Sequence, residues 1–331
     1  MTLLAVENLK VEFPNRRGTL VALRGIDFAL NEGERLGIVG ESGAGKSMAA
    51  FAVLKLISPP GRISEGRVLF EGRDLAQLDD EQIRAIRGDR ISMIFQDPMM
   101  TLNPVLTVGA QMIETLKAHR EISDDEAREL ALARLREVQI PSPEARLEAY
   151  PHELSGGLRQ RVVIAIALLS DPKIIIADEP TTALDVTIQA EILALLLALA
   201  RDHATALILI THDLAVVSQV TERIMVMYAG RIVEAGATRA IIDTPRHPYT
   251  KGLIAALPEQ NAPGQPLNQI RGSMPSLNEI PPGCAFAPRC DFASDVCRQD
   301  VPILREVGEQ TVACHHADTV DTADHSEGVL A

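Results

Sequence analysis

The stretch that decides the fold is GESGAGKS, residues 40–47, which follows the apolar run RLGIV at residues 35–39. Its glycines let the backbone curl so that several N–H groups point inward, where they and a helix N-terminus favour phosphate charge. The stretch lies between a predicted strand and a predicted helix at residues 46–56, which is the context of a P-loop. We expect Lys46 to reach the β- and γ-phosphates of a nucleotide and Ser47 to ligate Mg²⁺. The predicted nucleotide-binding residues of the loop are Gly40, Ser42, Gly43, Ala44, Gly45, Lys46 and Ser47.

A second informative stretch is KIIIADE, residues 173–179, an apolar strand that ends in two acids. Asp178 suits coordination of Mg²⁺ through water, and Glu179 suits polarisation of an attacking water as a catalytic residue. An ordinary strand with a polar end is the alternative. The P-loop upstream favours the interpretation as a catalytic site.

Strand and helix patterns alternate along the chain, which predicts an α/β fold with a parallel-sheet core. Residues 107–170 lose the strand signal and predict a helical insertion. Beyond about residue 235 prolines crowd the chain, which predicts a separate, loop-rich region. The predicted strands are residues 3–13, 20–30, 35–39, 67–70, 91–95, 173–177, 205–210 and 223–227.

Composition narrows the class of protein. The net charge of −13 argues against a general nucleic-acid binder, which normally needs a basic face. No apolar run approaches the roughly 20 residues of a membrane-spanning helix, and the N-terminus lacks the pattern of a signal peptide. We therefore expect a cytosolic protein that reaches a membrane only through a partner.

Further motifs follow in a specific order: Gln96 after a predicted strand, LSGGLRQR at 154–161, ALD at 183–185 and THD at 211–213. With the P-loop, they resemble the Q-loop, signature, D-loop and switch histidine of ABC ATPases. The resemblance implies a P-loop ABC-type nucleotide-binding domain, with a mixed or parallel sheet core, an antiparallel β subdomain and a helical subdomain. The expected organisation is an ATPase domain at 1–235 with the helical subdomain at about 97–170, a C-terminal region at 236–316 and a disordered tail at 317–331.

The same resemblance implies roles for single residues. Gln96 would sense Mg²⁺ and a transmembrane partner, His212 would contact the γ-phosphate as a catalytic residue, and Asp185 would line a dimer interface. Phe13 is the candidate for stacking on adenine, with a core phenylalanine as the alternative. The residues expected to bind the nucleotide of the opposite cassette are Ser155, Gly156, Gly157 and Gln160.

Three stretches narrow the resemblance to the oligopeptide and dipeptide importers: FQDPMMTLNP at 95–104, PTTALDVT at 180–187 and PRHPYT at 245–250. This implies an ATP-hydrolysing subunit on the cytoplasmic face of a bacterial inner membrane, as a peripheral protein. Expected partners are a second, homologous ABC ATPase subunit, two transmembrane permease subunits and an extracytoplasmic solute-binding protein, without nucleic acid. Alternatives are import of nickel or another small solute, a soluble ABC ATPase acting on nucleic acid, and a cassette that binds ATP without turnover.

The four cysteines of the chain all lie near its C-terminus, at Cys284, Cys290, Cys297 and Cys314. Stable disulfides are disfavoured in the cytosol, so four thiolates fit Zn²⁺ or an iron–sulfur cluster. Absence of a Cys-x-x-Cys pair weakens the zinc interpretation. The family resemblance implies a 4Fe–4S cluster, with Zn²⁺ or no metal as alternatives. If the module only clamps the tail, Cys290→Ser should leave ATP binding intact.

Overall fold

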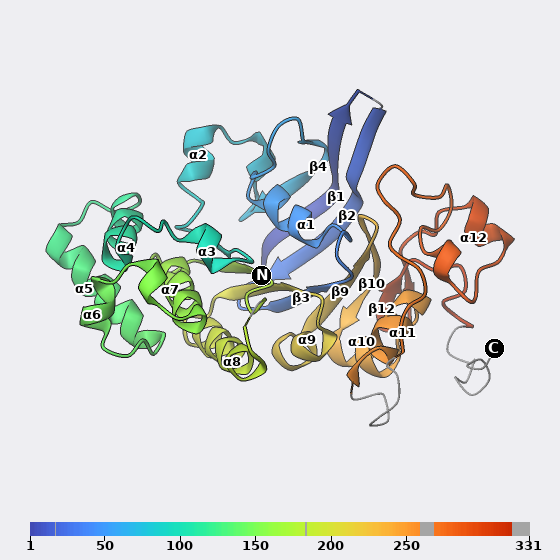
Figure 1. The fold of residues 1–331 in the computed structure, drawn as a ribbon. Coiled ribbons are helices and arrows are strands. Elements are labelled where there is room, and N and C mark those ends of the chain that lie inside the picture. Colours follow the sequence, from blue (N-terminus) through green and yellow to red (C-terminus); the bar gives the residue numbers. More distant parts are fainter. Residues whose placement is uncertain (17, 183, 259–267, 320–331) are drawn as a thin grey trace. The chain divides into compact units, whose positions relative to one another are not determined.

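The structure is a computed structural model, and it describes residues 1–16, 18–182, 184–258 and 268–319 (Figure 1). The chain forms two compact units. Unit 1 comprises Met1–Leu4, Leu30–Arg35 and Phe70–Ile210, and unit 2 comprises Ala5–Ala29, Leu36–Leu69 and Thr211–Ala331. In the described part of the chain, no helix is long and apolar enough to cross a membrane.

Unit 1 contains three parallel strands in the order β6, β7, β8. The pairs Ile91 with Ile174 and Ile174 with Ala206 set the register. Because the strands are parallel, their carboxyl ends meet at one edge, which is where ligands bind in α/β sheets. The strands of this unit are β5 (Arg73–Asp74), β6 (Ile91–Ile94), β7 (Ile174–Asp178) and β8 (Ala206–Thr211).

Between β6 and β7 the chain is helical, as expected. Ser123 caps the N-terminus of α5 by accepting the N–H of Glu126, and Ala127, Ala131 and Leu135 form its buried face at four-residue spacing. That face packs on α4, α6 and α7, while α7 in turn packs on β6 and α8. The helices are α2 (Asp80–Arg84), α3 (Pro98–Thr101), α4 (Val108–Lys117), α5 (Asp124–Glu137), α6 (Pro143–Leu147), α7 (Gly156–Leu168) and α8 (Val186–Asp202), with 3₁₀ turns at Leu75–Gln77 and Pro151–Glu153.

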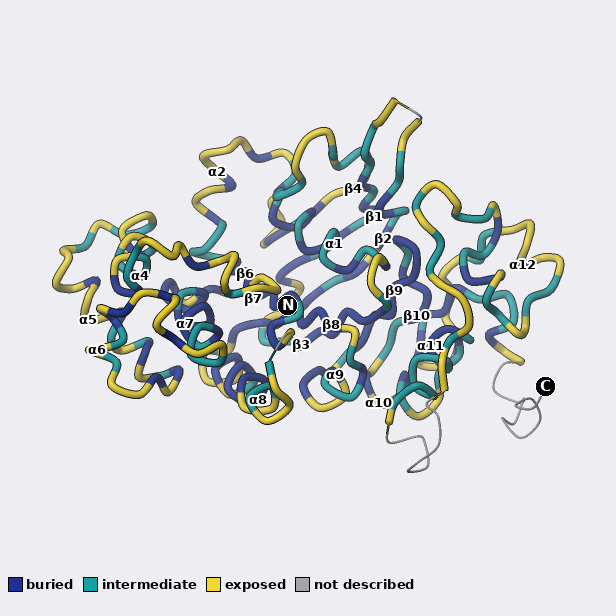
Figure 2. The backbone as a smooth tube through the Cα atoms, viewed as in Figure 1, coloured by how far each residue is buried: buried dark blue, intermediate teal, exposed yellow. Residues whose placement is uncertain are grey.

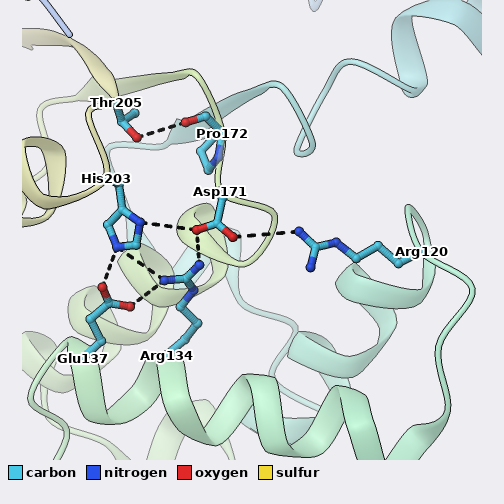
Figure 3. A network of polar contacts seen from close by, with 7 residues as sticks. All are labelled: Arg120, Arg134, Glu137, Asp171, Pro172, His203 and Thr205. Carbon is cyan, nitrogen blue, oxygen red and sulfur yellow. Dashed lines mark hydrogen bonds and ion pairs between the residues drawn. The ribbon is translucent and has the colours of Figure 1, made fainter.

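A polar network fixes the helical part of unit 1 to the strand that carries the two acids (Figure 3). Arg134 of α5 bonds to Asp171 just before β7, and to Glu137 at 2.6 Å. His203, at the end of α8, lies 2.5 Å from Glu137 and 3.3 Å from Asp171. Thr205 donates to the carbonyl of Pro172 at 3.0 Å. One guanidinium thus joins α5 to the beginning of β7.

Unit 2 contains the P-loop and the whole described C-terminal region. Strand β3 pairs in parallel with β9, and β9 pairs with β10 through a tight turn at Ala229 and Gly230, which both have positive φ. A separate antiparallel group has the order β2, β1, β4. The strands are β1 (Thr2–Asn15), β2 (Gly18–Asn31), β3 (Arg35–Val39), β4 (Arg62–Phe70), β9 (Arg223–Tyr228) and β10 (Arg231–Ala237).

The C-terminal region extends the sheet of unit 2 and is more regular than the loops expected there. Strand β12 (Gln310–Val312) pairs with β10, and β11 (Arg305–Val307) pairs with β12. Its backbone amides therefore find partners in a sheet, which the proline-rich sequence did not indicate. The helices of this unit are α1 (Lys46–Val53), α9 (Leu214–Val220), α10 (Thr238–Asp243), α11 (Pro248–Ala255) and α12 (Asp295–Gln299), with a 3₁₀ turn at Ala287–Arg289.

The start of the expected tail is packed into unit 2. Ala317 is fully buried beside Val307 and Val312, and Asp318 pairs with Arg305 at 2.6 Å. The remaining residues of that tail, 320–331, lie outside the described residues. Strands β3, β7, β8 and β9 are almost entirely buried, whereas much of β4 and parts of β1 and β2 are exposed or half-buried (Figure 2).

Candidate ATP site

The P-loop of unit 2 has the backbone that its sequence predicts. Gly40, Gly43 and Gly45 have φ values of 152°, 83° and 103°, which residues with a Cβ rarely adopt. Gly40 also packs against β9, where an added Cβ would lie 2.3 Å from the carbonyl oxygen of Met227. The carbonyl of Ala44 accepts the N–H of Gly230 at 2.9 Å, so the β9–β10 turn supports the loop.

Lys46 begins α1 and lies almost buried at the base of the loop. Its Nζ donates to the carbonyls of Gly40 at 2.8 Å and Glu41 at 3.1 Å. Ser42 and Gly43 are exposed, and an added Cβ on Gly43 would meet open space. The ammonium group is therefore held inside a ring of backbone with an open mouth, which is the arrangement of a phosphate cradle. Ser47 follows it in the first turn of α1.

Phe13 and His212, the other predicted residues in unit 2, have different surroundings. Phe13 is half-buried, and an added Cβ on Gly61 would lie 2.4 Å from its ring, so the ring rests on that glycine. His212 is exposed at the end of β8, before the Asp213 side chain that caps α9. Stacking of Phe13 on adenine and a γ-phosphate contact of His212 remain predictions.

Unit 1 brings Gln96 and Glu179 together at the carboxyl edge of its strands. The side-chain amide of Gln96 donates to Glu179 Oε2 at 3.1 Å, and the hydroxyl of Thr182 donates to the same oxygen at 2.9 Å. Asp178, the last residue of β7, is 4% exposed. Glu179 is therefore held by two donors beside a buried carboxylate. Thr182 belongs to the stretch PTTALDVT, residues 180–187. The sequence assigns it no role, because only the fold turns its hydroxyl toward Glu179.

The signature residues of unit 1 lie at the beginning of α7. Ser155 caps this helix and is exposed together with Gly156. Gly157 packs on α8, where an added Cβ would lie 2.9 Å from Ile188. Gln160 is buried, and its Nε2 has no hydrogen-bond partner among the residues that the structure describes. Asp185 is exposed and caps α8 by accepting the N–H of Ile188 at 3.0 Å, so signature and D-loop lie side by side.

The four cysteines lie in unit 2 as free thiols. Burial, and then the charges of the other cysteines, raise the pKa of Cys290 to about 12; burial raises the pKa of Cys314 to about 11. Backbone amides donate to three of the sulfurs: those of Phe286 and Ala287 to Cys284, of Phe292 to Cys290, and of His316 to Cys314. Among the described residues, no group of three or more His, Cys, Asp or Glu side chains forms a metal site.

Comparison with known proteins agrees with this set of motifs. A family model described as ABC transporter matches residues 23–182, and one described as oligopeptide/dipeptide transporter, C-terminal region, matches residues 233–297. A bacterial ABC transporter cassette solved as a dimer has a TM-score of 0.64 at 31% identity, covering 71% of this chain and 99% of that one. Fold and site thus define an ABC-type ATPase.

Curated relatives that align over nearly the full length of this chain identify its family within the ABC-type ATPases. The dipeptide transport ATP-binding protein DppD of Haemophilus influenzae is 47% identical, with 95% of this chain and 96% of the relative covered. DppD of Bacillus subtilis is 50% identical over 90% of each chain, and the oligopeptide transport ATP-binding protein OppD of Escherichia coli is 47% identical over 94% and 92%. The chain belongs to the ABC transporter ATP-binding proteins that carry the oligopeptide/dipeptide transporter C-terminal region.

Proposed function

We propose that this chain is the ATP-hydrolysing subunit of a bacterial importer for dipeptides or oligopeptides. The observation that carries the proposal is the Glu179 carboxylate, held by Gln96 and Thr182 next to Asp178. A fixed carboxylate beside a Mg²⁺ ligand suits the orientation of a water for attack on the γ-phosphate. Relatives named for dipeptide and oligopeptide transport, aligned along nearly the whole chain, support the class of solute.

ATP would close a pair of cassettes and hydrolysis would reopen it. Each γ-phosphate would lie between the P-loop of one cassette and the signature of the other. The exposed Ser155 and Gly156 at the N-terminus of α7 support this role, because a helix N-terminus favours a phosphate. The partner cassette would be a second, homologous ATPase subunit.

The chain would reach the cytoplasmic face of the membrane by docking on two permease subunits, supplied with solute by an extracytoplasmic binding protein. An apolar group surrounds Gln96 in the sequence: Phe95, Met99, Met100 and Val105 are 37%, 45%, 85% and 75% exposed. Exposed apolar side chains in such a group indicate a protein contact, and methionines adapt to a partner surface. Cytoplasmic helices of the permeases would cover this group.

We also propose that the four cysteines hold a 4Fe–4S cluster, with Zn²⁺ as the alternative metal. The four cysteines are free thiols in one segment of unit 2, and backbone N–H groups donate to three of the sulfurs. Such N–H donors favour thiolate sulfur and accompany metal–thiolate sites. The cluster would cross-link a segment that has few apolar contacts of its own. Iron and sulfide in anaerobically purified protein would support this, whereas zinc alone, or neither metal, would refute it.

The transport proposal is tested in proteoliposomes that contain the permeases and both ATPase subunits. We expect a dipeptide, presented with the binding protein, to accumulate inside the vesicles and to stimulate ATP hydrolysis. Matched vesicles with Glu179→Gln should bind solute outside and accumulate none. Stimulation by Ni²⁺ and not by peptide would reassign the solute. Co-purification with nucleic acid in place of permeases would overturn the proposal.

A further inference from the structure

The motif PRHPYT, residues 245–250, lies outside the P-loop in the sequence, and hydrogen bonds hold it firmly in unit 2. The buried carboxylate of Glu234, on β10, accepts the N–H groups of Arg246 at 2.6 Å and His247 at 3.0 Å. His247 is 1% exposed, and its Nδ1 accepts the N–H of Tyr249 at 3.0 Å. These bonds fix the first turn of α11 and with it the direction of the Tyr249 side chain.

Tyr249 links the first turn of α11 to the P-loop. Its ring is fully buried and packs edge-on against Tyr228, with ring centroids 4.7 Å apart. Its hydroxyl oxygen accepts the backbone N–H of Glu41, the second residue of the P-loop, at 2.7 Å. This N–H therefore points away from the phosphate cradle and is satisfied by the C-terminal region.

Arg289 holds the side chain of the same P-loop residue. Its two terminal nitrogens donate to the two carboxylate oxygens of Glu41 at 2.6 and 2.9 Å, and its side chain is only 5% exposed. Such paired bonds fix orientation as well as charge. Arg289 directly precedes Cys290 and ends the 3₁₀ turn that separates Cys284 from Cys290.

Glu41 thus connects the P-loop lysine to two side chains of the C-terminal region. Its carbonyl accepts Lys46 Nζ inside the loop, while its N–H and carboxylate are bound by Tyr249 and Arg289. Displacement of either C-terminal side chain would free the peptide that helps to hold the P-loop lysine.

We propose that Tyr249 and Arg289 are positioning residues of the ATP site, which hold the P-loop through Glu41 and make nucleotide affinity depend on the cysteine-bearing segment. Neither residue touches the phosphates. The proposal rests on the ATP site of the family and not on the solute, so a failure of peptide transport would leave it standing.

The first test uses the full-length chain with Tyr249→Phe, which removes one oxygen and keeps the ring packing. Tyr228→Phe is the matched control, because its hydroxyl lies in the same aromatic cluster and contacts Arg289 at 3.3 Å. We expect the Kd for ATP, measured by titration, to rise about tenfold in Tyr249→Phe, the order of one lost buried hydrogen bond, and less than twofold in Tyr228→Phe. A merely structural role would lower the melting temperature without nucleotide and leave the Kd unchanged, which would overturn the proposal.

The second test is a double-mutant cycle. Glu41→Gln and Arg289→Gln should each raise the Kd for ATP, and the double variant should bind no more weakly than either single one, because both remove the same contact. Arg289→Lys should not restore affinity, since an ammonium cannot make the paired bonds. Arg298→Gln, which loses only the exposed pair with Asp295, is the control. Additive effects of Glu41→Gln and Arg289→Gln would refute the coupling.

The contribution of the cysteine-bearing segment to ATP binding is tested by Cys290→Ser. We expect this substitution to weaken ATP binding in the native chain and to have no further effect in the Arg289→Gln chain. This differs from the independence of tail and ATP site expected from sequence, because Arg289 joins the two. An unchanged Kd in Cys290→Ser would show that the cysteine segment does not act on the P-loop.

Discussion

At the residue scale, Glu179 combines an unusual backbone with a fixed side chain. Its φ is +45°, a region in which residues other than glycine or asparagine are uncommon and cost energy. Its N–H bonds to the carbonyl of Ile210 at 2.8 Å, and Gln96 and Thr182 bind its carboxylate. The surrounding contacts therefore maintain a conformation that the free chain would avoid, as is common at catalytic positions.

Substitution of Glu179 by glutamine tests its role in turnover. The amide keeps the size of the side chain but cannot act as a base, so we expect ATP binding to persist and hydrolysis to fall by about 10²- to 10⁴-fold. The measurement is phosphate release beside ATP titration of the same protein. Near-normal hydrolysis would remove Glu179 from the mechanism.

The contribution of Lys46 to ATP affinity can also be measured by a single substitution. Lys46→Ala removes the ammonium from the P-loop, and a charge-assisted bond of about 1.5–3 kcal/mol predicts a Kd for ATP that rises about 10- to 100-fold. Lys55→Ala, beyond the end of α1, is a suitable control. Undiminished affinity in Lys46→Ala would contradict the assignment of the phosphate cradle.

At the element scale, α5 is joined to β7 through Arg134. We expect Arg134→Ala to lower the free energy of unfolding by about 1–2 kcal/mol, because it leaves Asp171 and Glu137 without their shared cation. The matched control is Arg136→Ala on the same helix, whose side chain is 57% exposed and pairs with Glu144. That surface pair should contribute at most about 0.5 kcal/mol. Equal losses for both variants in urea unfolding would show that the network does not stabilise unit 1.

The first turn of α11 should make unit 2 sensitive to acid. Burial lowers the pKa of His247 to about 3, whereas an unfolded histidine titrates near 6.5. Below pH ~6.5 only the unfolded state takes up this proton, so stability is lost as pH falls, at about 1.4 kcal/mol per unit down to pH ~3. Burial raises the pKa of Glu234, which opposes part of this loss.

The His247→Gln chain isolates that contribution, because glutamine can still accept a hydrogen bond but does not titrate. Between pH 7 and pH 5 its free energy of unfolding should fall by about 2 kcal/mol less than that of the native chain. Denaturant titrations at the two pH values measure both losses. Parallel losses would mean that His247 is not buried in its neutral form.

In the molecule as a whole, the exposed beginnings of α7 and α8 form the surface of unit 1 that we expect to meet another protein. Ser155 and Asp185 cap neighbouring helices and are exposed, and Val186 beside them is 82% exposed. An apolar side chain as exposed as that of Val186 would gain free energy if a partner covered it. This face would meet the partner cassette.

A bulky charged side chain on this face should leave ATP binding intact and prevent pairing with the second ATPase subunit. In the Glu179→Gln background, we expect Ser155→Arg to leave the Kd for ATP within about twofold, because the signature serves the opposite cassette, and to abolish ATP-dependent pairing with the second ATPase subunit. Light scattering with and without ATP measures the pairing. Thr187→Arg, further along α8, shows whether any arginine nearby has the same effect. Retained pairing in Ser155→Arg would move the interface elsewhere.

Local patterns in the sequence are enough to identify the class of protein, because P-loop, signature and strand-end acids are short motifs with defined spacing. The glycines of GESGAGKS after an apolar strand adopt the positive φ values that such a loop needs, and the helical region before the signature agrees with the loss of strand pattern at residues 107–170. The resemblance to peptide importers, carried by short motifs, agrees with relatives aligned along nearly the full chain.

The contacts that join these motifs to the C-terminal region depend on how the chain packs. No local pattern indicates that β12 pairs with β10, or that a tyrosine and an arginine more than 200 positions downstream bind Glu41, since such contacts depend on long-range packing. The sequence identifies PRHPYT as a pattern typical of the peptide importers. Only the folded structure shows that its Tyr249 accepts a hydrogen bond from the P-loop. Proline-rich composition indicates loops in the C-terminal region, whereas the sheet edge that receives its strands is created elsewhere in the chain.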